Sequence, residues 1–376
     1  TKVRLRAKGF SQVKETNKVN LEGVTLEIPR RDGTHWDQIK TATAEFDQTG
    51  QTLWAEGDVE IIMDVPEGEE PSGKLMKINT SGVKFEKAGK ATTDKPVKFQ
   101  FDRGEGSGVG ANYDINTREL QLLDQVHLVW KGKDAKAIPI EIDTKTATYK
   151  ETESVVFLDP WAKLKRATLT MESENAVVKL NNGLIDVVDA KNGRGVREEN
   201  GRKIEYAASQ LALKFSDKGQ IAKADGFGNA KLTSTGPASK THVVCDTINL
   251  EFEPKDKDTI LRKAWARGNS VIQSDPINIP KPRPANVPDS RILKADVVEL
   301  RMRANGEEIE SAETHAPSEL ELIPNRPGQP HRWLTGEKFW MTYAAENQLE
   351  TFRTVKAATK SIKPADKQQV PTLTWS

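Results

Sequence analysis

The sequence predicts an all-β fold built from consecutive hairpins, and three observations lead to this prediction. Apolar and polar residues alternate with a period of two along the whole chain, as in strands with one buried face. Sustained 3.6-residue periodicity is almost absent, and the best helical candidate, Thr259–Ala266, is too short to separate helix from strand. Polar turn residues separate the alternating segments. The clearest alternation runs through Val97–Phe101, Val126–Trp130, Ile138–Ile142, Ile248–Phe252 and Val298–Met302.

One unit repeats along these segments: a strand of small and apolar residues, a polar turn and a second apolar strand. Its clearest copy has strands at Ala42–Asp47 and Leu53–Ile61 around the turn Gln48–Gln51. Asn-Gly and Lys-Gly steps supply the positive backbone angles that tight hairpins need. The other copies place turns at Lys87–Lys90, Asn116–Thr117, Glu151–Ser154, Asn181–Gly183, Asp217–Gly219, Lys255–Asp258, Asn305–Gly306 and Glu346–Asn347.

Three stretches interrupt the repeat. Asp64–Lys74 and Ala190–Lys203 are rich in charge and glycine, and we expect both to be loops. Pro276–Pro288 contains Pro280, Pro282 and Pro284, so it is expected to be extended and not a central strand. We place a crossover or edge linker there, over residues 276–290.

Composition narrows the function without choosing it. The 376 residues carry a formal net charge of +1, which gives no reason to expect a nucleic-acid partner. Hydrophobic residues make up 36% and charged residues 30%, a balance that suits strands with one wet face. Cys245 is the single cysteine, and we interpret it as a small buried hydrophobe. A chain of this length predicts two domains, and its start at Thr1 without methionine suggests a segment of a longer protein.

The repeat resembles that of the OstA-like proteins, the group containing LptA, LptC and the periplasmic part of LptD. In that family an alanine-rich strand leads to a Tyr-Asp or Phe-Asp turn, and a Gly-Asn-Val or Gly-Asp-Val step follows. Here the matching residues are Ala44, Phe46-Asp47, Leu53 and Gly57-Asp58-Val59. Residues 20–130 match best, because an LptC-like pattern continues in order through 78–85, 91–97, 108–114 and 120–122.

The copies around Phe215, Phe252 and Gly268-Asn269-Ser270-Val271 are also OstA-like. At two turns Val178 and Met302 stand where the family has an aromatic residue, and the Pro-rich insert is foreign to its short members.

The resemblance implies a twisted antiparallel β-jelly roll with an open apolar trough for acyl chains. Residues 1–165 would form an LptC-like jelly roll, and residues 166–376 an OstA-like continuation. The implied function is a periplasmic scaffold, not an enzyme, that shields the acyl chains of lipopolysaccharide or a related glycolipid between membranes. Implied partners are other Lpt-type jelly rolls and an inner-membrane ABC transporter, joined by edge-strand pairing. An inner-membrane anchor would lie outside this chain.

Shielding alone would be enough for such a role. A six-chain lipid at about 0.8 kcal/mol per buried methylene would lose tens of kcal/mol by crossing water unshielded. Strand alternation predicts the side chains of the trough as a set, although any one of them could instead fill a closed sandwich core, as most buried strand residues do. The predicted set is Phe46, Val59, Ile61, Phe85, Phe99, Phe101, Tyr113, Leu122, Leu128, Phe215, Leu250, Phe252 and Leu300.

Other chemistry finds little support. The alternating glycines from Gly104 to Gly110 lack the Lys-Ser or Lys-Thr of a phosphate loop and predict a flexible or bulged strand. The five histidines are scattered and there is no second cysteine, so we expect no metal and no cofactor. Two alternative functions stay open. One is a structural or adhesive β-solenoid with a filled interior, and the other, ranked last, is a carbohydrate-processing β-sandwich with two facing carboxylates.

Overall fold

The computed structural model confirms the all-β prediction. It describes residues 3–30, 33–68, 76–87, 89–133, 137–199, 201–255, 258–279, 289–347, 349–362 and 372–375. Almost all of these lie in antiparallel strands, and among them the helical segments are two 3₁₀ turns, η1 (Glu151–Glu153) and η2 (Ala345–Asn347). This nearly all-β antiparallel architecture is consistent with a β-jelly-roll-like fold.

The chain divides into two compact units. Unit 1 comprises Thr1–Leu164, Glu174–Asp186 and Asp217–Gly219, and unit 2 comprises Lys165–Ser173, Val187–Ser216 and Gln220–Ser376. Unit 1 therefore includes two short segments from beyond position 165, whereas unit 2 begins at Lys165. The predicted jelly-roll boundary at 165/166 stays a prediction.

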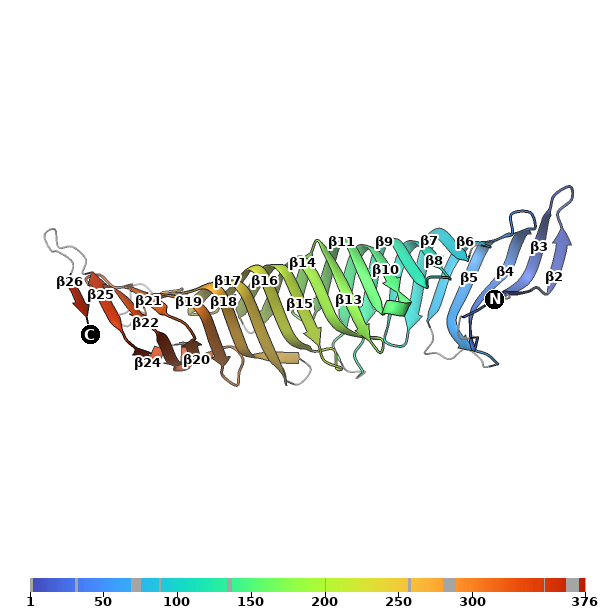
Figure 1. Ribbon diagram of the computed structural model, residues 1–376. Coiled ribbons are helices and arrows are strands. Elements are labelled where there is room, and N and C mark those ends of the chain that lie inside the picture. The colour runs from blue at the N-terminus through green and yellow to red at the C-terminus, as the bar shows by residue number, and fades with distance from the viewer. Residues whose placement is uncertain are drawn as a thin grey trace. The chain divides into compact units, whose positions relative to one another are not determined.

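In unit 1, strands that follow one another in sequence also pair with one another, as the labels of Figure 1 show. The two N-terminal strands both pair with β3, one along each half of it. The strands of unit 1 are β1 (Arg4–Arg6), β2 (Gly9–Gln12), β3 (Lys18–Pro29), β4 (His35–Asp47), β5 (Thr52–Pro66), β6 (Lys77–Glu86), β7 (Lys90–Phe101), β8 (Gly104–Asp114), β9 (Glu119–Trp130), β10 (Ile140–Lys150), most of β11 (Val155–Arg166) and β13 (Asn175–Asn181).

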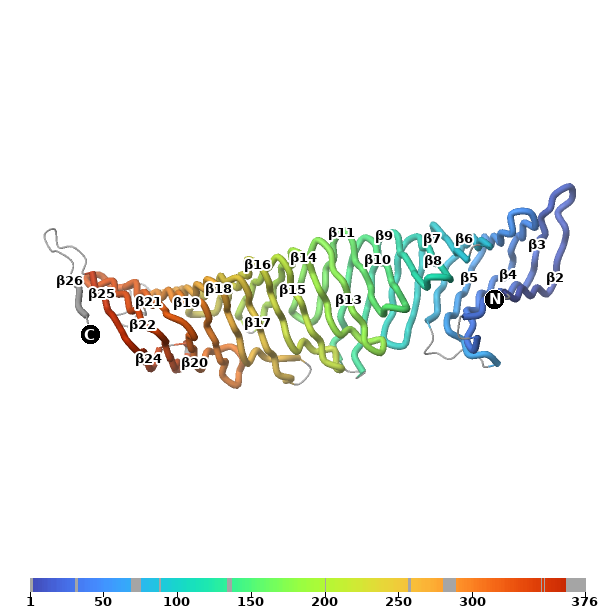
Figure 2. Tube along the Cα trace, in the orientation of Figure 1, coloured from blue at the N-terminus to red at the C-terminus, as the bar shows by residue number. Residues whose placement is uncertain are grey.

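The long strands of unit 2 also pair with their neighbours in sequence, and Figure 2 shows the chain doubling back after each of them. The short strands near its C-terminal end pair across one or more intervening strands. Its strands are β12 (Leu169–Ser173), β14 (Leu184–Glu199) from Val187 onward, β15 (Arg202–Phe215), β16 (Ile221–Thr235), β17 (Ser239–Lys255), β18 (Asp258–Pro276), β19 (Ser290–Met302), β20 (Ile309–Thr314), β21 (Ser318–Ile323), β22 (His331–Gly336), β23 (Lys338–Tyr343), β24 (Leu349–Val355), β25 (Ala358–Ile362) and β26 (Thr372–Trp375).

Many of the long strands contain a β-bulge near their middle. One extra residue interrupts the register between Ala55 and Asp58, between Phe227 and Ala230, and between Arg267 and Ser270. A bulge bends its strand and increases the local twist. The Gly-Asp or Gly-Asn step that resembles the OstA-like motif lies at each of these three bulges, so the motif marks the bend of a strand and not a hairpin.

All nine predicted turns lie between paired strands. At Asn182-Gly183 both residues have positive φ, +50° and +75°, as the Asn-Gly signal predicts. The helical candidate Thr259–Ala266 is part of strand β18. Of the Pro-rich stretch, Pro276 ends β18, and residues 280–288 lie outside the described part of the chain.

The loop prediction for Ala190–Lys203 is wrong, because β14 runs to Glu199 and pairs with β15 from Arg202 onward. Gly201 lies in the turn between these strands, with a positive φ of +72°, whereas Gly193 and Gly195 serve packing. A Cβ atom at Gly195 would lie 2.2 Å from the Tyr206 ring, and one at Gly193 would lie 2.6 Å from Leu211 Cδ1. The first loop prediction is wrong at its start, since β5 extends to Pro66; residues 69–74 lie outside the described residues.

The alternating glycines form strand β8. The extra residues of the bulges beside it lie in its neighbours, between Thr93 and Pro96 of β7 and between Asp124 and His127 of β9. Gly110 has a positive φ of +72°. Cβ atoms at Gly104 and Gly106 would lie 2.7 Å and 2.4 Å from the ring tips of Phe101 and Phe99. These two glycines therefore provide the space that the two phenylalanine rings occupy.

Candidate functional site

Strand register arranges the apolar side chains of unit 1 into two rows that cross the sheet. The first row crosses the halves of the strands that pair with the Leu26 half of β3. The second row crosses the halves that pair with the Phe46 half of β4. Most members of both rows are buried. The first row is Leu26, Ile39, Ile61, Ile78, Phe99, Gly106, Leu128 and Ile142. The second row is Val19, Phe46, Leu53, Phe85, Ala91, Tyr113, Leu120 and Tyr149.

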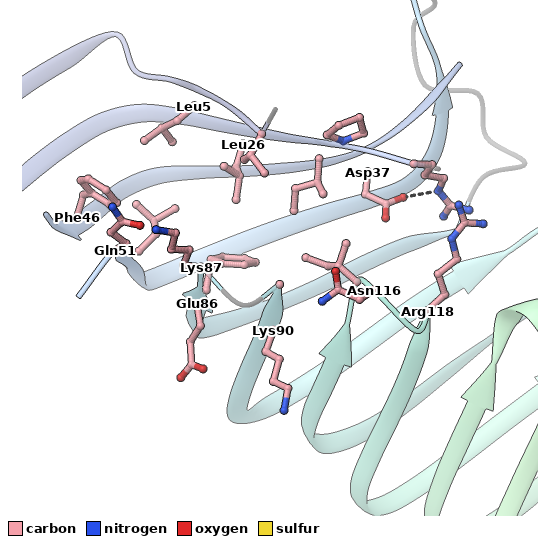
Figure 3. Close-up of a pocket in the computed structure, with 18 residues that line it drawn as sticks. Leu5, Leu26, Asp37, Phe46, Gln51, Glu86, Lys87, Lys90, Asn116 and Arg118 are labelled. Carbon is pink, nitrogen blue, oxygen red and sulfur yellow. Dashed lines mark hydrogen bonds and ion pairs between the residues drawn. The ribbon is translucent and has the colours of Figure 1, made fainter. Parts of the chain in front are cut away.

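The two rows meet in a pocket at the β1–β5 end of unit 1 (Figure 3). Its volume is about 570 Å³, within the usual range of small-molecule sites. Leu26 of the first row and Phe46 and Phe85 of the second row line it, and Leu5 of β1 lies beside Leu26. Phe46 and Asp37 lie at opposite ends in Figure 3. Gln51 and Lys87 are beside Phe46, whereas the end at Asp37 contains the buried charges and is called the charged end.

The charged end is a buried ionic cluster around Arg30, whose side chain is 4% exposed. Arg30 Nε donates a hydrogen bond to Asp37 Oδ1 at 2.8 Å, and its Nη1 lies 3.0 Å from Asp64 Oδ1. The same Nη1 donates to Glu151 Oε1 at 2.5 Å. A buried charge is tolerated only when it is paired in this way, so these carboxylates keep Arg30 inside.

Tyr113 and Arg118 extend this cluster from β8 and the turn after it. The Tyr113 hydroxyl donates to Asp37 Oδ2 at 3.3 Å, and Arg118 Nη1 lies 3.6 Å from Glu151 Oε1. Burial and the neighbouring Asp37 carboxylate raise the pKa of Tyr113 well above its usual value. Burial opposes the charge of Arg30, but Asp37 and Glu151 outweigh burial and raise the pKa of its guanidinium. Arg30 therefore stays charged at neutral pH.

Unit 2 has two corresponding rows. In the third row large residues alternate with alanines, and Leu250 and Leu300 are only half-buried. The third row is Val188, Leu213, Ala224, Leu250, Ala264, Leu300, Ala312, Met341 and Phe352. The fourth row is Met171, Gly195, Tyr206, Leu232, Val243, Ile272, Leu293, Leu320 and Leu334.

The predicted trough residues fall into three groups. Eight belong to the rows, and of these Phe46 and Phe85 line the pocket. Phe101, Phe215 and Phe252 lie further toward the strand ends, where Phe101 packs on Trp130 with ring centroids 5.3 Å apart. Val59 and Leu122 are buried near bulges. The eight row members are Phe46, Ile61, Phe85, Phe99, Tyr113, Leu128, Leu250 and Leu300.

The sequence reasoning missed the ionic cluster. Arg30 and Glu151 are 121 positions apart, and neither lies in a recognisable motif. The available signal was positional: Arg30 follows strand β3 directly, and Glu151 stands in a predicted turn. No sequence rule connects one turn with the other.

Glu299, Glu313 and His315 of unit 2 are close enough to share a metal ion. Glu299 already accepts hydrogen bonds from Lys263 at 2.9 Å and Arg301 at 3.2 Å, and His315 Nε2 lies 3.3 Å from its other oxygen. Burial opposes the charge of Glu299, but these partners outweigh burial and lower its pKa. An ion-pair network therefore accounts for this cluster without a metal.

Within the described residues, no helix is long and apolar enough to cross a membrane.

Residues 1–131 match the family described as "Lipopolysaccharide-assembly, LptC-related". No curated protein matches the chain. The matched region spans β1–β9, which contribute the pocket, Arg30 and both apolar rows up to β9.

Proposed function

Because residues 1–131 support an LptC/OstA-like member of the lipopolysaccharide-assembly family, we propose that this protein shields lipid acyl chains during lipopolysaccharide transport. The observation that carries the proposal is the pocket, where both apolar rows of unit 1 meet around Leu26, Phe46 and Phe85. An acyl chain there would contact side chains from both rows. The role requires no catalytic residue.

Half-buried row members support the same role in unit 2. Leu250 and Leu300 face alanines across the strand pairs, since Leu250 is opposite Ala224 and Ala264. Small residues between large ones leave shallow depressions in an apolar surface. Phe252, also half-buried, lies two residues along the strand from Leu250. We infer that acyl chains pass along these rows as well.

The proposal extends to partners and location. Among the described residues, β1 and β2 each pair with β3 alone, so their outer edges are available to another strand. We propose that this edge joins a further Lpt-type jelly roll in the periplasm, with energy supplied by an inner-membrane ABC transporter. We further propose that residues 1–165 are the LptC-like jelly roll and residues 166–376 its OstA-like continuation.

A structural β-sandwich with a filled interior is the second candidate, and the packing around β8 favours it. Gly104 and Gly106 are in tight contact with Phe101 and Phe99, so the middle of unit 1 has little space for a ligand. If this packing extended through both units, the rows would form a core and not a lipid path.

Site-specific photo-crosslinking in cells that make lipopolysaccharide tests the proposal. A photoreactive phenylalanine analogue at Phe46 and, separately, at Phe252 is expected to form lipopolysaccharide adducts. The same analogue at Trp54, an outward residue of β5 that is 43% exposed, is the control and should form none. A folded protein without adducts at Phe46 and Phe252 would exclude the transport role and favour the filled sandwich.

A further inference from the structure

The ion pair between Arg30 and Glu151 joins the ends of two strands of unit 1, which are called the two edges of the pocket below. Arg30 directly follows β3, whereas Glu151 directly follows β10 and begins η1. Their side chains meet at 2.5 Å across 121 positions of sequence. The contact therefore joins the end of β3 to the end of β10, next to the pocket.

Arg30 and Glu151 differ in the number of other partners that hold them in place. Arg30 retains Asp37 and Asp64 from its own edge, at 2.8 Å and 3.0 Å, whether or not Glu151 is present. Glu151 is bound through Oε1 alone. Its Oε2 is buried and has no hydrogen-bond partner among the described residues. An incompletely satisfied buried carboxylate stabilises a contact less than a complete one, so Glu151 is the side that can release.

The contact also stands where the pocket ends. Arg30, Asp37 and Arg118 line the pocket, and Figure 3 shows Asp37 and Arg118 together at the end opposite Phe46. Separation of Glu151 from Arg30 would leave the apolar part around Phe46 and Phe85 intact. It would change only how widely the two edges stand apart.

We propose that the Arg30–Glu151 ion pair is a latch that closes the charged end of the pocket, and that its release admits an apolar chain between the two rows. This inference rests on the proposed function, because it assigns an entry route to the same pocket. A latch controls the rates of entry and exit and leaves the equilibrium affinity nearly unchanged, since the bound chain contacts the same apolar side chains.

Glu151→Gln is the matching variant. It preserves the size of the side chain, removes its charge and leaves Arg30 paired with Asp37 and Asp64. The control is Asp217→Asn, which removes the exposed ion pair between Lys133 and Asp217 at 2.8 Å, outside the pocket lining. Binding of N-phenyl-1-naphthylamine to the full chain is followed by stopped-flow fluorescence. Glu151→Gln should raise the association and dissociation rates several-fold with less than a twofold change in Kd, and Asp217→Asn should change neither rate.

Hydrogen exchange without lipid provides a separate readout. The Ser154 amide donates to the Glu151 carbonyl at 3.1 Å, and the Glu151 amide to the Arg118 carbonyl at 3.2 Å. Both amides should exchange faster in Glu151→Gln than in the wild type. Unchanged exchange and unchanged probe rates in this variant would overturn the latch. A wild-type protein that binds no probe would overturn the proposed function and the entry route with it. Hydrogen exchange would still decide whether the ion pair holds the two edges together.

Discussion

Glycines in the strands of this protein provide space for aromatic rings. Gly106 faces Phe99 and Gly195 faces Tyr206, each at a distance that leaves no room for a Cβ atom. Glycine weakens a strand on its own, so its presence here has a packing cause. Gly195 shows why the loop prediction for Ala190–Lys203 was wrong, because a glycine that accommodates a ring was interpreted as a loop residue.

Gly106→Ala should lower the free energy of unfolding by about 1–3 kcal/mol, because the new methyl group would overpack the interior against Phe99 and Leu128. Urea denaturation followed by circular dichroism measures the change. The matched control is Gly57→Ala, where a Cβ atom meets no neighbour within 4 Å. We expect the control to stay within about 0.5 kcal/mol of the wild type.

The second-site variant Phe99→Leu removes the ring that the added methyl group meets. In the Phe99→Leu background, Gly106→Ala should lower the free energy of unfolding by less than it does in the wild type. Equal costs of Gly106→Ala in both backgrounds would show that the glycine is needed for another reason.

Strands in this protein bend at Gly-Asn steps. At Gly228-Asn229 both residues have positive φ, +71° and +51°, and the register between β16 and β17 gains one residue there. Glycine and asparagine tolerate this region of backbone space, and β-branched residues do not. The motif that resembles the OstA-like repeat therefore has a conformational meaning that is independent of any ligand.

Asn229→Val should destabilise unit 2 by about 1–2 kcal/mol, because valine would be forced into the left-handed region. Asn229→Gly should be close to neutral, since glycine adopts the same angles without strain. Thermal unfolding of the two variants tests the pair, and the exposed side chain at this position excludes a packing explanation. A valine variant as stable as the glycine variant would mean that the bulge relaxes without cost.

At the scale of the whole molecule, each strand pairs mainly with its neighbours in sequence. In such serial architectures stability is approximately a sum of local terms, and a local defect is felt mostly nearby. Cys245 of β17 can report on unit 2, because it is buried and burial raises the pKa of its thiol. Its modification should require local opening.

We expect Asn229→Val to accelerate modification of Cys245 by Ellman's reagent, since Cys245 is opposite Ala230 at the same bulge. Gly106→Ala in unit 1 should leave the modification rate close to that of the wild type. The absorbance of the released thiolate gives both rates. Equal acceleration by the two variants would show that the units unfold as one.

The positions of all nine turns, and of most strands, could be predicted from the sequence; the exceptions are the parts of β5 and β14 that were predicted as loops. Alternation with a period of two, Asn-Gly dipeptides and left-handed glycines act over a few residues, so they can be read locally. The sequence also placed Phe46 and Phe85 correctly as apolar strand residues, and both line the pocket. These features need no knowledge of distant partners.

Which apolar residues share a row, and which charges are buried, depends on how the strands assemble. A row depends on register across many strands, and one bulge shifts every later partner in that pair. Arg30 and Glu151 meet because β3 and β10 end beside the same pocket, and Tyr113, predicted as an apolar lining residue, turns its hydroxyl to Asp37. The energy of such contacts arises from burial, and burial exists only once the strands have assembled.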